Sequence, residues 1–417
     1  MINYIYTFMI SISKDNRMFV LLFLFTIFLA ICTVFFIPFS KSTPINYVYT
    51  NEFIETGKVV SNFLPVGYTA FLAIAMKLGG DYAIIFFQAL VYISIVIIPY
   101  FFIRSLKVPK YLIITTFFLF ALHPYFLFNI VRIVDTNLTA LFLLLFYLGI
   151  IYFFSDKGQV IKNYIKSVML GSFFAFLFLI RPNTLLLGII PIILYLRYTI
   201  FSFQERIKGL ILFFVTFFVV VGCVNFFMRG EILFFPKNGG YNFFVGSNKY
   251  SFDAILNHYT GEPSIVEFQR KNPGLLIEKN DTLYWDNPLY WNIGITYVTQ
   301  YPILYLRDGI LKFFTLFRPD YREVDANVGI LKYSRLILQT IMVLPVIIWL
   351  YIYLKNPENF FTYHNTIFFL FVFLYILPFV LTTSDPRYRL PLDAIFIIDS
   401  ILRLSQRKKF IKKIHST

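Results

Sequence analysis

The stretch ALHPYFLFNIVRIVDT, residues 121–136, lies between two long apolar runs of the chain. It carries His123, Asn129, Arg132 and Asp135, and no other charged residue occurs between Lys110 and Ser155. Because Arg132 and Asp135 are three positions apart, a helical turn would place them on one face. Charges at the end of a membrane span are costly unless they are solvated, paired with an opposite charge or part of a functional site. We therefore expect the rest of the chain to hold these polar groups over a membrane.

The composition predicts an all-α polytopic membrane protein. The chain has 417 residues, of which 58% are hydrophobic and 14% are charged, whereas soluble domains carry about 25% charged residues. The 54 Phe and 30 Tyr residues suit lipid-facing surfaces and interfacial belts. We expect a multi-pass protein of the cell membrane, either a bacterial inner membrane or a plasma membrane.

The net charge of +15 is concentrated in basic flanks of the apolar runs and in the C-terminal tail. Such flanks indicate cytoplasmic anchoring first and attraction to anionic lipid second. A nucleic-acid partner would need a soluble basic domain, and the sequence offers none. Both cysteines, Cys32 and Cys223, lie inside apolar runs, so we predict no disulfide framework. We also expect no metal and no cofactor.

The apolar runs predict about ten transmembrane helices, with both chain ends inside according to the basic flanks. They cover about residues 18–38, 82–103, 111–128, 136–154, 167–180, 183–199, 209–228, 336–354, 363–382 and 389–404. The apolar part of residues 64–80 is too short to cross, so we expect an interfacial helix that ends at Gly79 and Gly80.

These spans divide the chain into three parts. Residues 1–228 form an N-terminal transmembrane half, whose polar first outer loop, 39–81, carries candidate catalytic residues. Residues 229–335 contain the long polar segment, where we expect a small extracytoplasmic domain and an interfacial amphipathic helix at 301–317. Residues 336–417 hold the last transmembrane helices and a basic cytoplasmic tail.

This topology collects polar groups on the outer face, and their chemistry suits transfer of a group from a lipid phosphate. Arginine forks bind phosphate in a bidentate manner, and a carboxylate can take a proton from an attacking hydroxyl. The candidate bases are Glu52, Glu55 and Asp135; the candidate phosphate ligands are Arg132, Arg181, Arg387 and Arg389; the candidate donor or acceptor contacts are His123, Asn183, Tyr241, Asn242 and Tyr388.

Five segments in order resemble motifs of the GT-C glycosyltransferases. PVGYTAFLAIA with FFQAL, residues 65–75 and 86–90, resembles "PPGYPLFLAL … LLQAL". LHPYFLFNIVRIVDTNL (122–138) has an acid just before the next helix, as in these enzymes. LIRPNTLLL (179–187) resembles "TRPTGLLL", NGGYNFFVGSN (238–248) resembles "NGGYNLLVGNN", and DPRYRLPLD (385–393) resembles "DPRYRLPLDP". The nearest group is the family 39 type, akin to protein O-mannosyltransferases and to the aminoarabinose transferases of lipid A.

The resemblance implies a GT-C-like bundle, a polyprenyl-phosphate-sugar donor, inverting transfer and an extracytoplasmic site. The acceptor would be a glycan, a lipid or a protein, and membrane lipids would surround the bundle. The family places an Asp in the first outer loop as general base, but no Asp occurs here between Asp15 and Asp81, and Asn46 lies near that place. Either Glu52 or Glu55 takes the role, or Asp135 does, or the chain lacks this activity.

Simpler interpretations remain open for single residues and for the whole chain. Asp135 could cap the helix that follows it, Arg132 could only pair with Asp135 or with lipid headgroups, and Arg181 could be a solvated turn residue. A lipid-linked glycan flippase, polymerase or ligase also binds polyprenyl phosphates with outward arginines. A catalytically silent scaffold would keep the same helices without the base.

Overall fold

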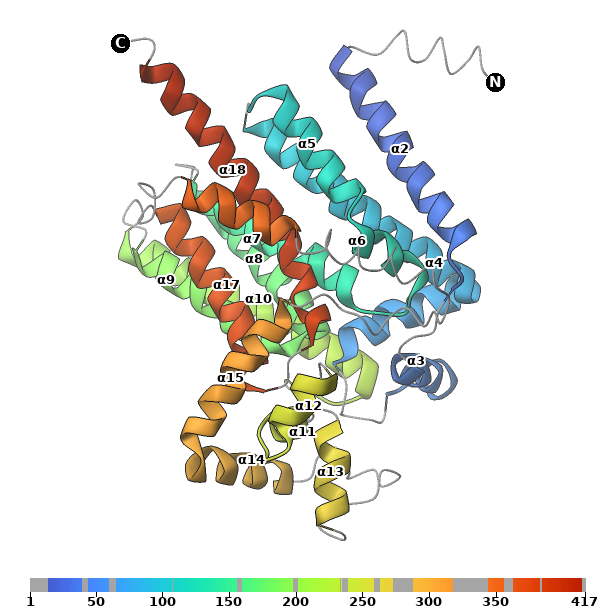
Figure 1. The fold of residues 1–417 in the computed structure, drawn as a ribbon. Helices are drawn as coiled ribbons and strands as arrows, with labels where there is room; N and C mark the ends of the chain where they lie inside the picture. Colours follow the sequence, from blue (N-terminus) through green and yellow to red (C-terminus); the bar gives the residue numbers. More distant parts are fainter. Residues whose placement is uncertain are drawn as a thin grey trace.

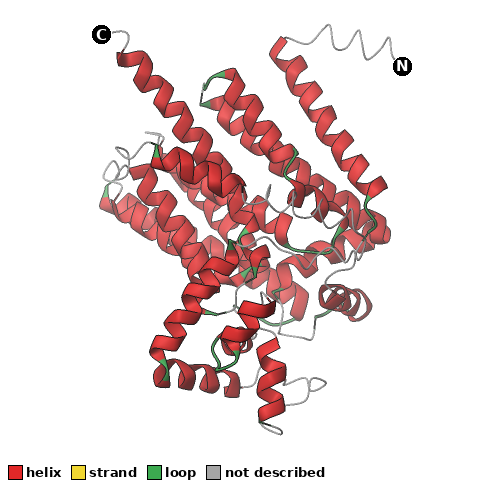
Figure 2. Cartoon of the chain, viewed as in Figure 1, coloured by secondary structure: helices red, strands yellow, loops and turns green. Residues whose placement is uncertain are grey.

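The computed structural model describes residues 14–39, 44–59, 65–106, 108–155, 160–197, 202–232, 234, 239–258, 263–272, 288–317, 344–355, 363–382 and 385–414. Within these ranges every regular element is a helix, as Figure 2 shows. The predicted all-α class is therefore confirmed for the described part of the chain. The helices form one large bundle with a smaller group of helices packed below it in the view of Figure 1.

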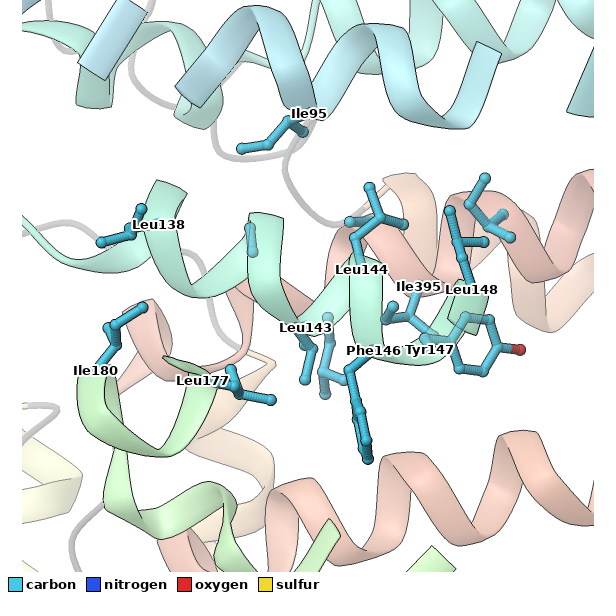
Figure 3. Packing of buried hydrophobic residues seen from close by; sticks show 14 of the residues in the cluster. Ile95, Leu138, Leu143, Leu144, Phe146, Tyr147, Leu148, Leu177, Ile180 and Ile395 are labelled. Atoms are coloured by element: carbon cyan, nitrogen blue, oxygen red, sulfur yellow. The ribbon is translucent and has the colours of Figure 1, made fainter. Parts of the chain in front are cut away.

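The bundle surrounds helix α7, which follows Asp135 directly. Leu144 and Phe146 of α7 are fully buried on opposite sides of the helix, with Leu144 on the side of Ile95 of α4 (Figure 3). Helix α7 packs against α4, α8 and α18. A helix that is apolar all round and buried in this way belongs to the centre of a bundle. The bundle helices are α2 (Lys14–Phe36), α4 (Val66–Ser105), α5 (Lys110–Ala121), α6 (Pro124–Phe128), α7 (Thr136–Ser155), α8 (Val160–Ile180), α9 (Ile189–Arg197), α10 (Phe203–Arg229), α17 (Tyr363–Leu381), α18 (Leu390–Ile414) and the helix Leu344–Leu354.

Four helices of the described chain are long and apolar enough to cross a membrane: they are Arg17–Phe36, Val66–Ser105, Thr136–Phe153 and Phe203–Arg229. A fifth span results if the bent pair Lys110–Ala121 and Pro124–Val131 is counted as one. Shorter apolar helices occupy Tyr164–Ile180, Pro182–Arg197, Leu344–Leu354 and Asn365–Leu381. The chain is therefore a helical membrane protein, while the count of about ten spans is not confirmed and stays a prediction.

Two breaks in the helices have local causes. Helix α4 is interrupted at Gly79 and Gly80, where Gly80 adopts φ 63° and ψ −146°, a conformation open essentially to glycine alone. This break confirms the predicted end of the helix at 64–80. The predicted span 111–128 is bent, because α5 ends at Ala121 and the chain turns by 46° before Pro124 starts α6.

The polar first outer loop predicted at 39–81 contains a helix, α3 (Pro44–Thr56). Pro44 occupies its first position, where proline costs no hydrogen bond. Thr50 and Phe53 are buried, with Phe53 5.9 Å from Phe227 of α10 and 5.1 Å below the ammonium of Lys77 of α4. This packing against α4 and α10 explains why a polar segment folds here: its two buried side chains supply the tertiary contacts that propensity alone does not.

The start of α4 lies directly against the end of α8 because Gly67 has no side chain. A Cβ at Gly67 would come within 2.7 Å of the Leu179 carbonyl group and 2.9 Å of the Ile180 amide nitrogen. These atoms belong to rigid backbone, so the two helices would have to separate to accommodate a methyl group. The glycine therefore fixes α4 beside the turn that carries Arg181.

We predict that Gly67→Ala destabilises the protein by about 1–3 kcal/mol through overpacking, although alanine favours helix. Thermal unfolding in detergent should show the loss as a lower Tm. Gly222→Ala is the matched control, because the nearest atom to a Cβ there is a side-chain methyl group at 3.8 Å. Equal Tm values for the two variants would contradict the close approach.

The smaller group of helices, which we call the small helical unit, comprises α11 (Gly239–Gly246), α12 (Ser251–His258), α13 (Pro263–Lys271), α14 (Pro288–Gln300) and α15 (Pro302–Leu316). It has its own apolar cluster, which includes Phe244, Phe268 and Tyr290. The unit contacts the bundle where a Cβ at Gly246 would overlap the Thr382 carbonyl oxygen. Figure 1 shows α15 running from α14 towards the bundle. The domain boundaries given above stay predictions.

Lys312 of α15 is fully buried at this junction, and its Nζ has no hydrogen-bond partner among the described residues. Gly246 lies against the amine, since a Cβ there would be 2.9 Å from Nζ. Burial lowers the pKa of Lys312 to about 7, against the opposing attraction of Asp308. The unfolded chain, with the ordinary pKa of 10.5, then holds more protons than the folded chain between these two values. Lys312 therefore makes stability rise with pH across that window.

We predict that Lys312→Met raises the Tm at neutral pH and flattens its rise from about pH 7 to about pH 10, because it removes a buried amine. The measurement is the Tm in detergent across this pH range. Lys271→Met on α13 is the control, since Lys271 is exposed. A slope in Lys312→Met as steep as in Lys271→Met would contradict the burial of a neutral amine.

Candidate functional site

The centre of the candidate site is a two-pronged ion pair between Asp135 and Arg181. Arg181 Nε lies 2.7 Å from Asp135 Oδ2, and Arg181 Nη2 lies 2.9 Å from Oδ1. Asp135 precedes α7 directly and Arg181 follows α8 directly, so the pair joins two neighbouring helix ends. The Arg181 side chain is buried, whereas the Asp135 side chain remains 29% exposed. The carboxylate can therefore meet a molecule that approaches from outside.

The C-terminal segment adds two tyrosines to this pair. Arg181 Nη1 lies 3.5 Å from the Tyr375 hydroxyl, and the guanidinium carbon lies 5.4 Å from the centre of the Tyr388 ring. The Tyr375 hydroxyl donates a 2.9 Å hydrogen bond to the Tyr388 carbonyl oxygen. Segments almost 200 positions apart in the sequence thus meet around one guanidinium.

A second arginine, Arg387, lies near the same tyrosine ring. Its guanidinium carbon is 5.6 Å from the Tyr388 ring centre, and its Nε is 3.2 Å from Asp385 Oδ2. The Arg387 side chain is 34% exposed. The 3₁₀ helix η5 (Pro386–Tyr388) orients it, and the Arg387 amide donates a 3.0 Å hydrogen bond to Asp385 Oδ1. Two guanidinium groups, two carboxylates and Tyr388 therefore form one cluster, which we call the arginine cluster.

The charges of this cluster hold one another ionised. Burial opposes ionisation of the Asp135 carboxyl, but the Arg181 charge and hydrogen bonds outweigh it and hold the pKa of Asp135 below its usual value. The Asp385 charge raises the pKa of Arg387, although burial opposes this shift. Asp135 is therefore a carboxylate at neutral pH and can attract a proton or a cation.

His123 and Arg389 lie in a separate buried cluster around Asp393 of α18. His123 Nε2 is 3.4 Å from Asp393 Oδ2, and Arg389 Nη2 is 3.5 Å from the same oxygen. The His123 ring also stacks on Phe126 at 4.3 Å. Arg389 was predicted beside the other arginines, but the turn at η5 directs Arg387 and Arg389 to different neighbours.

The prediction that Arg132 and Asp135 share a helical face is wrong. The chain is extended at Arg132, with φ −125° and ψ 139°, because the 3₁₀ helix η1 (Asn129–Val131) ends just before it. The Arg132 carbonyl accepts a 2.7 Å hydrogen bond from Gln88 of α4, which holds this extended segment in place. Asp135 is thus free to pair with Arg181.

The remaining predicted residues lie on other elements. Glu52 and Glu55 are on α3, with Glu52 half-buried and Glu55 exposed. Asn183 is half-buried in the 3₁₀ helix η2 (Pro182–Gly188), just after Arg181. Tyr241 and Asn242 are half-buried on α11, where Tyr241 packs edge-on against Tyr290 of α14 at 5.6 Å. The structure therefore brings Asp135, Arg181, Arg387 and Tyr388 together in one cluster. It places the other candidate residues outside this cluster.

Sequence reasoning missed Asp393 and Tyr375 of these clusters and gave Asp385 no role. Asp385 and Asp393 stand inside the quoted motif DPRYRLPLD, so the motif itself carried a signal for them. Tyr375 lies within an apolar run and carried none. Within the described ranges, no three His, Cys, Asp or Glu side chains come together as metal ligands would.

Comparison with known proteins gave no match to any family model, any curated protein or any solved structure.

We predict that Arg181→Gln destabilises the protein by about 3 kcal/mol or more, because it leaves Asp135 with an uncompensated charge. Adding Asp135→Asn should restore part of the lost Tm, since it removes that charge. Arg270→Gln is the control, because Arg270 pairs with Glu267 on the surface of α13. A double variant that is no more stable than Arg181→Gln alone would contradict a coupled pair.

Proposed function

We propose that this protein is a membrane glycosyltransferase that moves a sugar from a polyprenyl-phosphate donor to an acceptor hydroxyl. The site would face the extracytoplasmic side of the cell membrane. The observation that carries the proposal is the arginine cluster, in which Arg181 and Arg387 flank the Tyr388 ring beside the part-exposed carboxylate of Asp135. Guanidinium groups stabilise a leaving phosphate, and a carboxylate accepts a proton. The five motifs quoted above support the same reaction class.

An apolar crevice next to these clusters supports a donor with a hydrocarbon tail. The crevice has a volume of about 350 Å³ and lies between α5, the helix Leu344–Leu354 and α18, with Phe118, Ile348 and Ile397 among its lining residues. His123 lies at its edge and contacts Asp393, whose carboxylate also faces Arg389. We propose that the lipid tail lies in this crevice and that the headgroup extends past His123 towards the arginine cluster.

The proposed reaction is a single displacement. The acceptor oxygen attacks the anomeric carbon of the sugar, and the bond from that carbon to the phosphate oxygen breaks. The polyprenyl phosphate leaves with the electron pair, and the acceptor proton passes to a carboxylate. Arg387, which is more exposed than Arg181, would stabilise the charge that develops on the phosphate. Arg181 would hold Asp135 in place.

Asp135 is the base that this geometry favours among the three candidates. It is the carboxylate that touches the arginine cluster, whereas Glu52 and Glu55 belong to α3. Because Arg181 lowers its pKa, Asp135 stays ionised at neutral pH, but it is also a weaker base.

A second candidate is a protein that binds lipid phosphates without transferring a sugar. The pairing of both carboxylates in the arginine cluster favours it, because Asp135 binds Arg181 and Asp385 binds Arg387. A flippase, polymerase, ligase or silent scaffold would use the arginines for binding alone. Such a protein would hold the donor but leave the bond from sugar to phosphate intact.

The deciding test uses the full chain in lipid nanodiscs with a radiolabelled polyprenyl-phosphate hexose or pentose and a panel of glycan, lipid and peptide acceptors. We predict sugar transfer by the wild type and a loss of about 100-fold or more in Arg387→Gln. Arg270→Gln should keep wild-type transfer, since Arg270 lies on the exposed surface of α13. Wild-type rates in Arg387→Gln would contradict the role of this arginine, and donor binding without transfer by the wild type would favour the second candidate.

A further inference from the structure

Helix α15 presents an unbroken apolar stripe to its surroundings. Ile303, Leu306, Ile310, Phe313 and Phe314 all have exposed side chains, with Leu306 at 66% and Ile310 at 62%. Their spacing of three, four, three and one positions places them on one face of a helix. A soluble helix normally turns such a face towards the protein interior.

The opposite face of α15 is polar and buried. Asp308, Lys312 and Thr315 are fully buried there. Asp308 accepts hydrogen bonds from the Tyr297 hydroxyl at 2.7 Å and from the Ser251 hydroxyl at 3.2 Å. Asp308 and Lys312 therefore point into the protein and the five apolar side chains of the stripe point out, which is the reverse of the usual amphipathic helix.

Helix α13 of the same unit shows the usual arrangement. Ile265 and Phe268 are buried there, whereas Arg270 and Lys271 are exposed. The inversion is thus a property of α15 and not of the whole small helical unit. Two helices of one unit that differ in this way face two different environments, water for α13 and an apolar medium for α15.

The one charged side chain beside the stripe is turned away from it. The Arg307 guanidinium lies 3.7 Å above the Phe252 ring of α12 and 3.1 Å from Asp308 Oδ1. This arrangement lets the long side chain cover protein surface while the charge is paired. The stripe itself therefore carries no uncompensated charge that would repel hydrocarbon.

The stripe adjoins the surface of an apolar helix of the bundle. The Tyr305 hydroxyl donates a 2.8 Å hydrogen bond to the carbonyl oxygen of Leu381, the last residue of α17, and Leu381 is itself exposed. A Cβ at Gly309 would contact the Val380 side chain at 3.5 Å. Helix α15 thus packs against the C-terminal end of α17, which is an apolar helix.

We propose that the outward face of α15 is immersed in the acyl chains of the bilayer and seats the small helical unit on the membrane. The occupant is lipid because the stripe is apolar, is continuous with the end of α17 and lies opposite buried charges. Such a helix inserts its apolar face about 5–10 Å into the boundary between headgroups and chains. The proposal does not depend on the chemistry of the arginine cluster.

The test uses nitroxide labels on single cysteines in the full chain, with Cys32→Ser and Cys223→Ser as background, in liposomes of phosphatidylcholine and phosphatidylglycerol. The labelled variants are Leu306→Cys and Ile310→Cys on α15. Val266→Cys on α13 is the matched control, because Val266 is also apolar and is 68% exposed. Power saturation measures the collision of each label with oxygen, which concentrates in lipid, and with a water-soluble nickel chelate.

We expect the two α15 labels to collide mainly with oxygen and the Val266 label to collide mainly with the nickel chelate. Equal access to the nickel chelate at all three positions would overturn the proposal. Strong dipolar broadening between Leu306 labels of different molecules would overturn it as well, since a second copy would then cover the stripe. Mixing the labelled protein with unlabelled protein identifies broadening between molecules, because dilution removes intermolecular broadening and leaves the collision rates unchanged.

Discussion

The ion pair between Asp135 and Arg181 is the constraint on which the candidate site depends. A part-buried carboxylate and a buried guanidinium each carry a large desolvation cost, and each becomes tolerable only beside the other. Their pairing fixes the start of α7 against the end of α8. Gly67 brings the start of α4 to the same place, and Tyr375 and Tyr388 bring the C-terminal segment. Four stretches that are far apart in the sequence thus meet around one charge pair.

The cost of burying an unpaired charge also accounts for the arrangement of the small helical unit. Asp308 and Lys312 are buried on α15 while large apolar side chains point outward, and α13 shows the opposite pattern a short distance away. In each place a charge is either paired, as in Asp308 with Arg307, or held as a neutral group, as burial favours for Lys312. The arrangement is consistent with a protein that meets both lipid and water through its small helical unit.

The helical membrane class followed from composition and run length, and Gly79–Gly80 marked a real break because glycine alone tolerates that backbone. The residues Asp135, Arg181 and Arg387 were also identified, since each is a charged residue beside an apolar run. The ion pairs that these residues form were not identified. Asp135 was placed on one helical face with Arg132 because helical spacing is visible in a sequence, whereas the contact with Arg181 depends on how α7 and α8 pack. The helix at Pro44–Thr56 was missed for the same reason: tertiary contacts of Phe53, and not local propensity, stabilise it.

The proposed function requires one membrane-facing site that holds a lipid phosphate beside arginines of separate segments. Electron cryomicroscopy of the protein in a nanodisc, with a non-transferable polyprenyl-phosphonate sugar bound, addresses this claim directly. The expected map has the phosphonate within hydrogen-bonding distance of Arg387, the lipid tail in the crevice beside Ile397, and Asp135 still bound to Arg181. A map with the phosphonate elsewhere, or with Asp135 and Arg387 on opposite sides of the bilayer, would contradict it.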